Sequence, residues 1–153
     1  GGRLRELGQD AEGPVSVEYQ PLKLEVVSAD KMVMQCDVVN VIARTSEGDI
    51  GILPGHEPLM AALVPCMVEV IVADGRTEIL AIDGGLLAVA QGHIRVLSHE
   101  VKLAEEILLE EARKEAHELR HIRSQGEATD DQIHRLHILN AQIRAGEKYQ
   151  ASR

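Results

Sequence analysis

The residues best suited to chemistry form the pattern HExxH at residues 117–121. On a helix, His117 and His121 would share one face and could ligate zinc, with Glu118 as the general base of a peptidase. A zinc peptidase also needs a third ligand and a substrate cleft, and this stretch is a highly charged one near the C-terminus. Short motifs often match by accident. Two more histidines, His134 and His137, could complete a chance metal site. Solvated polar residues are nevertheless the favoured interpretation of the motif, and a zinc peptidase is the alternative.

Other catalytic and binding classes find little support. The sequence has no G-x-x-x-x-G-K-S/T loop and no G-x-S-x-G elbow, and we expect no bound cofactor. The net charge is −9, which opposes a nucleic-acid partner, and no aromatic platform exists because Phe and Trp are absent. No apolar run approaches the roughly 18–20 residues of a membrane span. Cys36 and Cys66 are expected to be small buried hydrophobic residues and not a disulfide framework.

The pattern divides the chain into three regions, at 1–20, 21–99 and 100–153. The first is a polar, Gly-bearing leader. The second alternates apolar and polar residues with period two, as at Leu22–Val26, which is typical of strands. Asp74-Gly75 predicts a type I′ hairpin turn, and Gln91-Gly92 is expected to act similarly. Residues 86–89 are apolar on both faces, which predicts central strands.

The third region has helical composition. Residues 101–123 lack Gly and Pro and are rich in Glu, Leu, Ala, Lys and Arg. After a break at 124–126, Thr129 or Asp130 can cap a second helix, which we expect to end at Gly146. Both apolar stripes are narrow, so the helices need a surface or a partner. The predicted fold class is α+β, an N-terminal two-layer β-sandwich followed by a C-terminal two-helix antiparallel hairpin.

Three stretches resemble one known family. They are Val26–Asp30, the sequence SEGDIGILPGHEPL at 46–59, and the Gly84-Gly85 pair that enters an apolar strand before Ile94–Leu97. Together they are similar to the epsilon subunit of bacterial F-type ATP synthases, called delta in mitochondria. The resemblance spans the predicted sandwich in the right order, and the helical hairpin fits the family's architecture.

The resemblance implies a non-catalytic central-stalk subunit that couples the gamma subunit to the membrane rotor ring of c subunits during proton-driven ATP synthesis. It implies a peripheral place on an energy-coupling membrane, at the bacterial cytoplasmic face or the matrix side of the mitochondrial inner membrane. By resemblance, the candidates for the contact with the ring and gamma lie in one segment, and they are Glu47, Gly48, Asp49, Gly51, Pro54, Gly55, His56 and Pro58.

In this family the hairpin can inhibit ATP hydrolysis by reaching the alpha and beta subunits. The basic candidates for that contact are Arg113, Lys114, Arg120, Arg123, Arg135 and Arg144. Some members bind ATP through a motif I/L-D-x-x-R-A, where this chain has Leu108 for the Asp and Glu111 for the Arg. A carboxylate cannot hold a phosphate as a guanidinium does, so we predict no ATP sensing there. A generic β-sandwich adaptor outside ATP synthase is the remaining alternative.

Overall fold

The computed structural model describes residues 3–4, 17–18 and 20–153. Most of the leader expected over 1–20 lies outside the described residues, except for a two-residue pairing of β1 (Arg3–Leu4) with β2 (Val17–Glu18). The main sheet contains β3 (Leu22–Val27), β4 (Met32–Thr45), β5 (Gly48–Ile52), β6 (Leu59–Val72), β7 (Thr77–Ala90), β8 (His93–Leu97) and β9 (Val101–Leu103). The helical part contains a 3-10 turn (Ala104–Glu106), α1 (Leu109–Ser124) and α2 (Asp130–Ala151).

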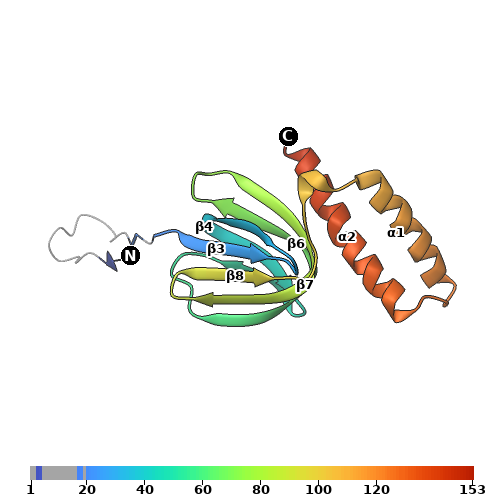
Figure 1. Ribbon diagram of the computed structural model, residues 1–153, viewed down its shortest axis with the longest axis horizontal. Helices are drawn as coiled ribbons and strands as arrows, with labels where there is room; N and C mark the ends of the chain where they lie inside the picture. The colour runs from blue at the N-terminus through green and yellow to red at the C-terminus, as the bar shows by residue number, and fades with distance from the viewer. Residues whose placement is uncertain (1–2, 5–16, 19) are drawn as a thin grey trace.

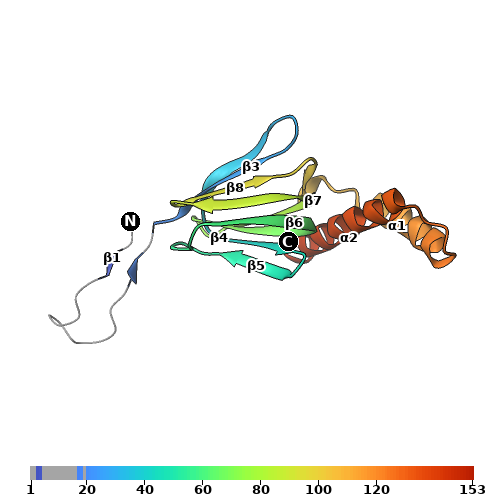
Figure 2. The ribbon, with the colours of Figure 1, turned by 90° about the horizontal axis from the view of Figure 1, so that it is seen from below.

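The strands fold into the predicted sandwich, which is closed like a barrel (Figures 1 and 2). The hydrogen-bonded order is β3-β8-β7-β6-β4-β5, and β3 also pairs with β4, so the sheet meets itself. β3 runs antiparallel to β4 and parallel to β8. One continuous cluster of aliphatic side chains and Cys66 fills the interior. This confirms the α+β class with a core built without aromatic residues.

The long strands change their inward face halfway along. In β7 the even-numbered Leu80 and Ile82 point into the core before the Gly84-Gly85 pair, and the odd-numbered Leu87 and Val89 point into it afterwards. Both glycines have positive φ, at 104° and 140°. A Cβ at Gly85 would overlap the backbone oxygen of Leu97. The pair therefore lets the strand turn at a corner, where its partner changes from β9 to β8.

Of the two predicted hairpin turns, one differs in type from the prediction and one agrees with it. At Asp74-Gly75 only the glycine has positive φ, at 100°. The Gly75 amide donates to the Val72 oxygen and the Val72 amide donates to the Arg76 oxygen, both at 2.8 Å, which describes a three-residue loop. The prediction of a type I′ turn there was wrong. Gln91-Gly92 has positive φ at both positions, 53° and 80°, and is the type I′ turn of this sheet.

The helical boundaries also depart from expectation. The helix predicted from residue 101 begins only at Leu109, because residues 101–103 pair with Leu80–Ile82 of β7. Ladder hydrogen bonds to the sheet outweigh helical propensity at Val101, Lys102 and Leu103. The second helix has Thr129 as N-cap, with a capping box to Gln132. It continues past Gly146 to Ala151, so the predicted stop was wrong.

Gly146 instead allows α2 to pack closely against the residues at the start of α1. It is buried in α2, and a Cβ there would lie 3.1 Å from Cδ1 of Leu109 at the start of α1. α2 packs on the outside of the sandwich through Ala145, next to Ile79 and Ala81 of β7. α1 lies on the far side of α2 from the sheet (Figure 1). No helix in the described residues is long and apolar enough to cross a membrane.

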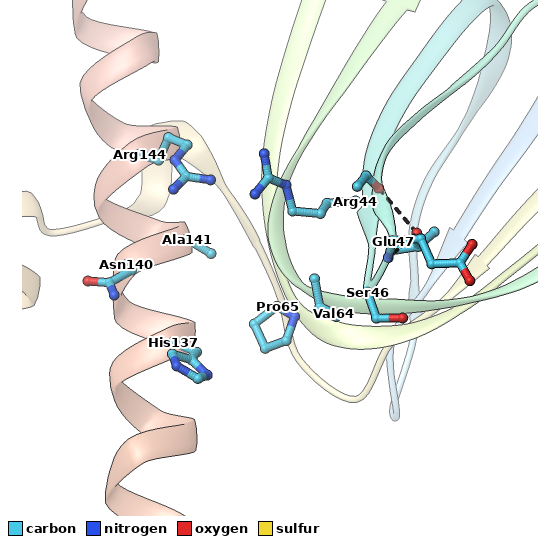
Figure 3. Close-up of a pocket in the computed structure, with 11 residues that line it drawn as sticks. Arg44, Ser46, Glu47, Val64, Pro65, His137, Asn140, Ala141 and Arg144 are labelled. Atoms are coloured by element: carbon cyan, nitrogen blue, oxygen red, sulfur yellow. Dashed lines mark hydrogen bonds between the residues drawn. The ribbon is translucent and has the colours of Figure 1, made fainter.

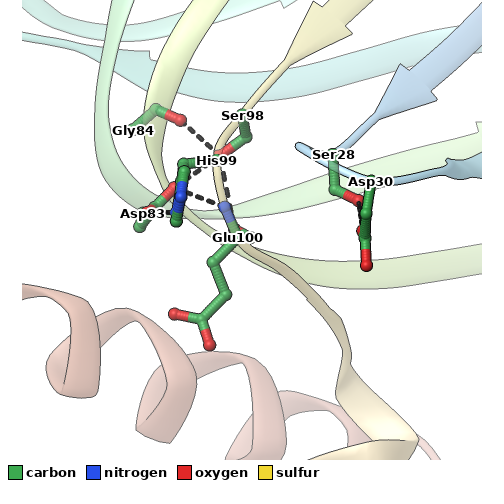
Figure 4. Close-up of polar contacts among 7 residues, drawn as sticks. All are labelled: Ser28, Asp30, Asp83, Gly84, Ser98, His99 and Glu100. Atoms are coloured by element: carbon green, nitrogen blue, oxygen red, sulfur yellow. Dashed lines mark hydrogen bonds and ion pairs between the residues drawn. The ribbon is translucent and has the colours of Figure 1, made fainter.

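A polar cluster fixes the corner between sandwich and hairpin (Figure 4). One carboxylate oxygen of Asp83 accepts the Ser98 hydroxyl at 2.7 Å and the Glu100 amide at 3.0 Å. Ser98 is 6% exposed and, over residues 20–153, is one of two buried polar residues. These hydrogen bonds fix the path of the chain directly after β8. They thereby position β9 to pair with β7 and fix where the helical part begins.

Candidate functional surfaces

The β4–β5 turn presents two of the predicted interface carboxylates. The Thr45 hydroxyl accepts the Glu47 amide at 3.0 Å and donates to the Gly48 oxygen at 3.1 Å. Gly48 has φ of 124°, which a residue with a side chain rarely adopts. Asp49 pairs with Arg44, with 2.9 Å between Oδ1 and Nε. The turn is thus a rigid, exposed presentation of acidic groups.

The structure separates the interface candidates into two groups. β5 lies between the turn at Glu47 and Gly48 and the loop that contains Pro54, Gly55, His56 and Pro58. A strand of this length spans roughly 15 Å at about 3.3 Å per residue. In the loop, the His56 amide donates to the Leu53 oxygen at 3.0 Å, and Nδ1 of His56 lies 2.7 Å from the Glu57 oxygen. Residues that are contiguous in the sequence therefore lie at two ends of the sandwich. Gly51 lies between them, on the edge strand β5.

An apolar surface that the sequence analysis missed lies on the outside of β6, β7 and β8. Met60 is 70% exposed and Leu97 is 40% exposed. The register places Met60 opposite Ala88, and Ala62 opposite Leu86, which in turn is opposite Leu97. We call Met60, Ala62, Leu86, Ala88 and Leu97 the outer apolar face. Its signal was the two-sided apolar run at 86–89, from which we predicted only a central strand, and β7 does lie between β8 and β6.

The basic side chains of the hairpin divide by their partners. Arg113 pairs with Glu110 at 2.6 Å and with Glu147 at 2.9 Å, and Arg135 holds Glu115 through two hydrogen bonds of 2.8 and 3.0 Å. These contacts lower the pKa of the Glu115 carboxyl, mainly through the hydrogen bonds from Arg135. Within residues 20–153, no carboxylate forms an ion pair with Lys114, Arg120, Arg123 or Arg144.

The segment aligned with the family's nucleotide motif is acidic. Leu108 is 66% exposed, and Glu111 lines a cleft of about 140 Å³ together with Glu106 and Glu115. The basic groups in this cleft are Lys102 and Arg135, the latter already paired with Glu115. A lining with these carboxylates repels phosphate, so the absence of ATP sensing remains our prediction.

The HExxH histidines do not form a metal centre with their neighbours. His117 and His121 are exposed on α1, and His134 and His137 are exposed on α2. Over the described ranges, no group of three His, Cys, Asp or Glu side chains could hold a metal ion. The zinc-peptidase alternative thus finds no third ligand in this part of the chain. Cys36 and Cys66 are free, Cys36 only half-buried, and burial raises the pKa of both thiols.

Comparisons with known proteins agree with the fold. The family described as ATP synthase, Delta/Epsilon chain, beta-sandwich domain matches residues 21–104, ending directly after β9. The ATP synthase epsilon chain of Cutibacterium acnes is 42% identical over 137 residues, covering 84% of this chain and 94% of the relative. The epsilon chain of Streptomyces avermitilis is 36% identical over 108 residues, covering 71% of this chain and 85% of the relative.

Solved structures extend the similarity to the whole architecture. A chain of the Euglena gracilis mitochondrial ATP synthase superposes with a TM-score of 0.68 at 26% identity, covering 92% of this chain and 86% of that chain. A chain of the Tetrahymena thermophila mitochondrial ATP synthase central stalk and c-ring gives a TM-score of 0.55 at 13% identity, covering 86% and 98%, and supports the fold alone. Sequence and fold together place this chain in the ATP synthase delta/epsilon family, as a central-stalk subunit of an F-type ATP synthase.

Proposed function

We propose that the sandwich anchors this subunit to gamma and couples gamma to the membrane rotor ring, while the hairpin modulates ATP hydrolysis. The observation that carries the proposal is the outer apolar face. It is exposed, contiguous across three strands and rimmed by the ion pair of Arg95 with Glu25, at 3.0 Å. Contiguous exposed apolar surface bordered by polar groups is typical of protein interfaces. We assign gamma as its occupant.

The two ends of β5 supply the remaining contacts of the proposal. The rigid acidic turn with Glu47 and Asp49 suits polar loops of the rotor ring, and the loop with His56 suits the edge of gamma. None of these groups is arranged for catalysis, so the subunit transmits torque without reacting chemically. It works as a peripheral part of the membrane complex, on the bacterial cytoplasmic face or the matrix side of the mitochondrial inner membrane.

The hairpin offers the contact to the catalytic head. Lys114, Arg120 and Arg123 are exposed on α1, the helix farther from the sheet. They form no ion pair with the described residues and are free to meet acidic surfaces of the alpha and beta subunits. The hairpin would act as a brake when it leaves the sandwich and these groups reach the head.

Binding to gamma tests the anchor. Met60→Glu places a charge in the middle of the outer apolar face and should weaken the complex with gamma at least tenfold, because the charge must be desolvated. Leu108→Glu is the matched control, since Leu108 is 66% exposed and lies directly before α1, outside this face. Equal affinity of both variants for gamma would contradict the assignment.

Hydrolysis tests the brake. A matching catalytic head stripped of this subunit would receive either the full chain or a chain ending at Ala104. The shorter chain keeps β9, which pairs with β7 and belongs to the sheet. Binding of both with inhibition by the full chain alone supports the proposal. If both chains bind and neither inhibits hydrolysis, the coupling role stands and the inhibitory role of the hairpin is contradicted.

A further inference from the structure

A cavity of about 600 Å³ lies between the sandwich and α2 (Figure 3). One wall is the end of β4 and the β4–β5 turn, including Arg44 and Ser46. The opposite wall is α2, with His137, Asn140 and Arg144. The cavity therefore bridges the two parts of the molecule whose relative movement the proposed function requires.

The charge in this cavity is positive. Figure 3 shows the guanidinium groups of Arg44 and Arg144 turned toward each other across the opening. Arg44 uses its Nε for Asp49, which leaves its terminal nitrogens available. No carboxylate of the described residues forms an ion pair with Arg144. Glu47 also lines the cavity, but its carboxylate points away from both arginines in Figure 3. Two like charges that face each other repel, and a negative group between them would relieve that repulsion.

This cavity is separate from the segment aligned with the family's nucleotide motif. The acidic cleft takes Arg135, Leu139 and Gln142 from α2, whereas the basic cavity takes residues that include Arg144. Arg135 and Arg144 are about two and a half helical turns apart and so point to opposite sides of the helix. The two surfaces also differ in charge, since the first contains three glutamates.

We infer that the basic cavity binds a compact oxyanion of the phosphate class. The planar N–H arrays of two arginines match phosphate oxygens. No Phe, Tyr or Trp side chain is among the residues that line the cavity, so it lacks the large stacking surfaces typical of sites for nucleotide bases. The phosphate group itself is the recognised feature, whether free in solution or carried by a lipid headgroup.

An anion held by both arginines would connect α2 to the β4–β5 turn. A ligand that binds only the docked arrangement stabilises that arrangement in proportion to its occupancy. Phosphate would thus keep the hairpin against the sandwich and away from the catalytic head. This regulatory consequence rests on the proposed function, whereas the binding itself does not.

Calorimetric titration of the full chain with inorganic phosphate, against chloride at equal ionic strength, tests the site. We expect saturable binding, and a loss of at least tenfold in affinity for Arg144→Gln, because a charge-assisted hydrogen-bonding partner is removed. Arg120→Gln removes the same charge from α1 outside the cavity and should bind like the unaltered chain. Circular dichroism would verify that both variants are folded. Absence of phosphate binding, or equal binding by both variants, would overturn the inference.

Two further measurements locate the site and its source of phosphate. Amide chemical-shift changes should concentrate at residues 44–48 and 137–144, and changes confined to α1 would overturn the assignment. Flotation with phosphatidylcholine vesicles, with and without phosphatidic acid, tests the lipid source. If the chain binds phosphatidic acid vesicles, and this binding depends on Arg144 and is displaced by free phosphate, the ligand is the lipid headgroup. If the chain binds free phosphate but not these vesicles, the ligand is the free anion. If phosphate binds but does not relieve the inhibition of ATP hydrolysis by the full chain, only the regulatory role is overturned.

Discussion

The sandwich and the hairpin are held together by different means. The sandwich has one continuous core, with Leu24, Leu80 and Ile94 at or below 1% exposure. The hairpin has a thin seam of Ala112, Ala116, Leu136 and Leu139, and it depends on a contact of α2 with the sheet. A large core gives cooperative stability, whereas a thin seam supports local opening at lower free energy. We therefore expect the sandwich to unfold as one unit and the hairpin to open locally at a lower free energy.

The largest expected effect concerns the corner of the sandwich. Gly85→Ala should lower the free energy of unfolding by about 4 kcal/mol, because strain at positive φ adds to overlap with the Leu97 oxygen. Gly75→Ala should lose only about 1–2 kcal/mol, since Gly75 has positive φ but open space around it. Urea unfolding followed by circular dichroism measures both. Equal losses would show that close approach at the corner contributes nothing.

The next effect separates the two parts directly. Leu24→Ala in the sandwich and Leu136→Ala in the hairpin should each lose about 2–5 kcal/mol, since both side chains are fully buried. Native-state hydrogen exchange should show the first loss across all strands and the second only in α1 and α2. Lower protection of β6 and β7 in Leu136→Ala would mean that the two parts unfold as one unit.

A smaller effect concerns the contact of α2 with the sheet. Lys148 on α2 pairs with Glu69 on β6 at 2.8 Å, and the Glu69 side chain is only 17% exposed. A double-mutant cycle with Glu69→Gln and Lys148→Gln should give a coupling of about 0.5–1 kcal/mol in the opening of α2. The same cycle on Lys23 and Asp37, an exposed pair within the sandwich, is the control and should leave α2 unchanged. A coupling of zero between Glu69 and Lys148 would mean that apolar packing alone holds α2 against the sheet.

The smallest effect is pH dependence within the hairpin. Arg135 lowers the pKa of Glu115 below its ordinary value of 4.5, so the pair stabilises the folded hairpin above that pH. This stability is lost as the pH falls through the lowered pKa. The contribution should stay below about 1 kcal/mol because the Glu115 side chain is 45% exposed. Exchange in α1 of Glu115→Gln should differ from the unaltered chain at neutral pH and converge with it in acid, and a difference independent of pH would exclude the ion pair as its cause.

Local sequence patterns predicted most of the sandwich. Leu22, Leu24 and Val26 alternate as expected and are all buried, because period two in a strand puts every second side chain on the same face. The Thr129 cap was likewise recognisable, since its hydrogen bonds involve residues close in sequence. Features that depend on distant partners were not predictable, as for Val101–Leu103, whose strand exists only through pairing with β7.

The surfaces were harder to predict than the fold. The outer apolar face was not predicted because residues 86–89 are all apolar and do not reveal which side chains face outward. The inward set of β7 changes parity at Gly84-Gly85, which places Leu86 and Ala88 on the outside. The resemblance named contiguous positions from Glu47 to Pro58 as one site, and only the backbone of β5 shows that they lie at two ends. Arg44 and Arg144 are far apart in sequence, and no local pattern links them.

The position of β3 between β4 and β8 has a consequence for the synthesis of the chain. β3 can pair with β4 as soon as both have left the ribosome, but its parallel partner β8 begins only at His93. Contacts between such distant segments form slowly, because a long loop must close first. One edge of β3 therefore stays open while β5, β6 and β7 are translated, and the barrel closes only after most of the chain has emerged. During that interval the nascent chain exposes an unpaired strand edge, and early chaperone protection of Leu22–Val27 would reduce its aggregation.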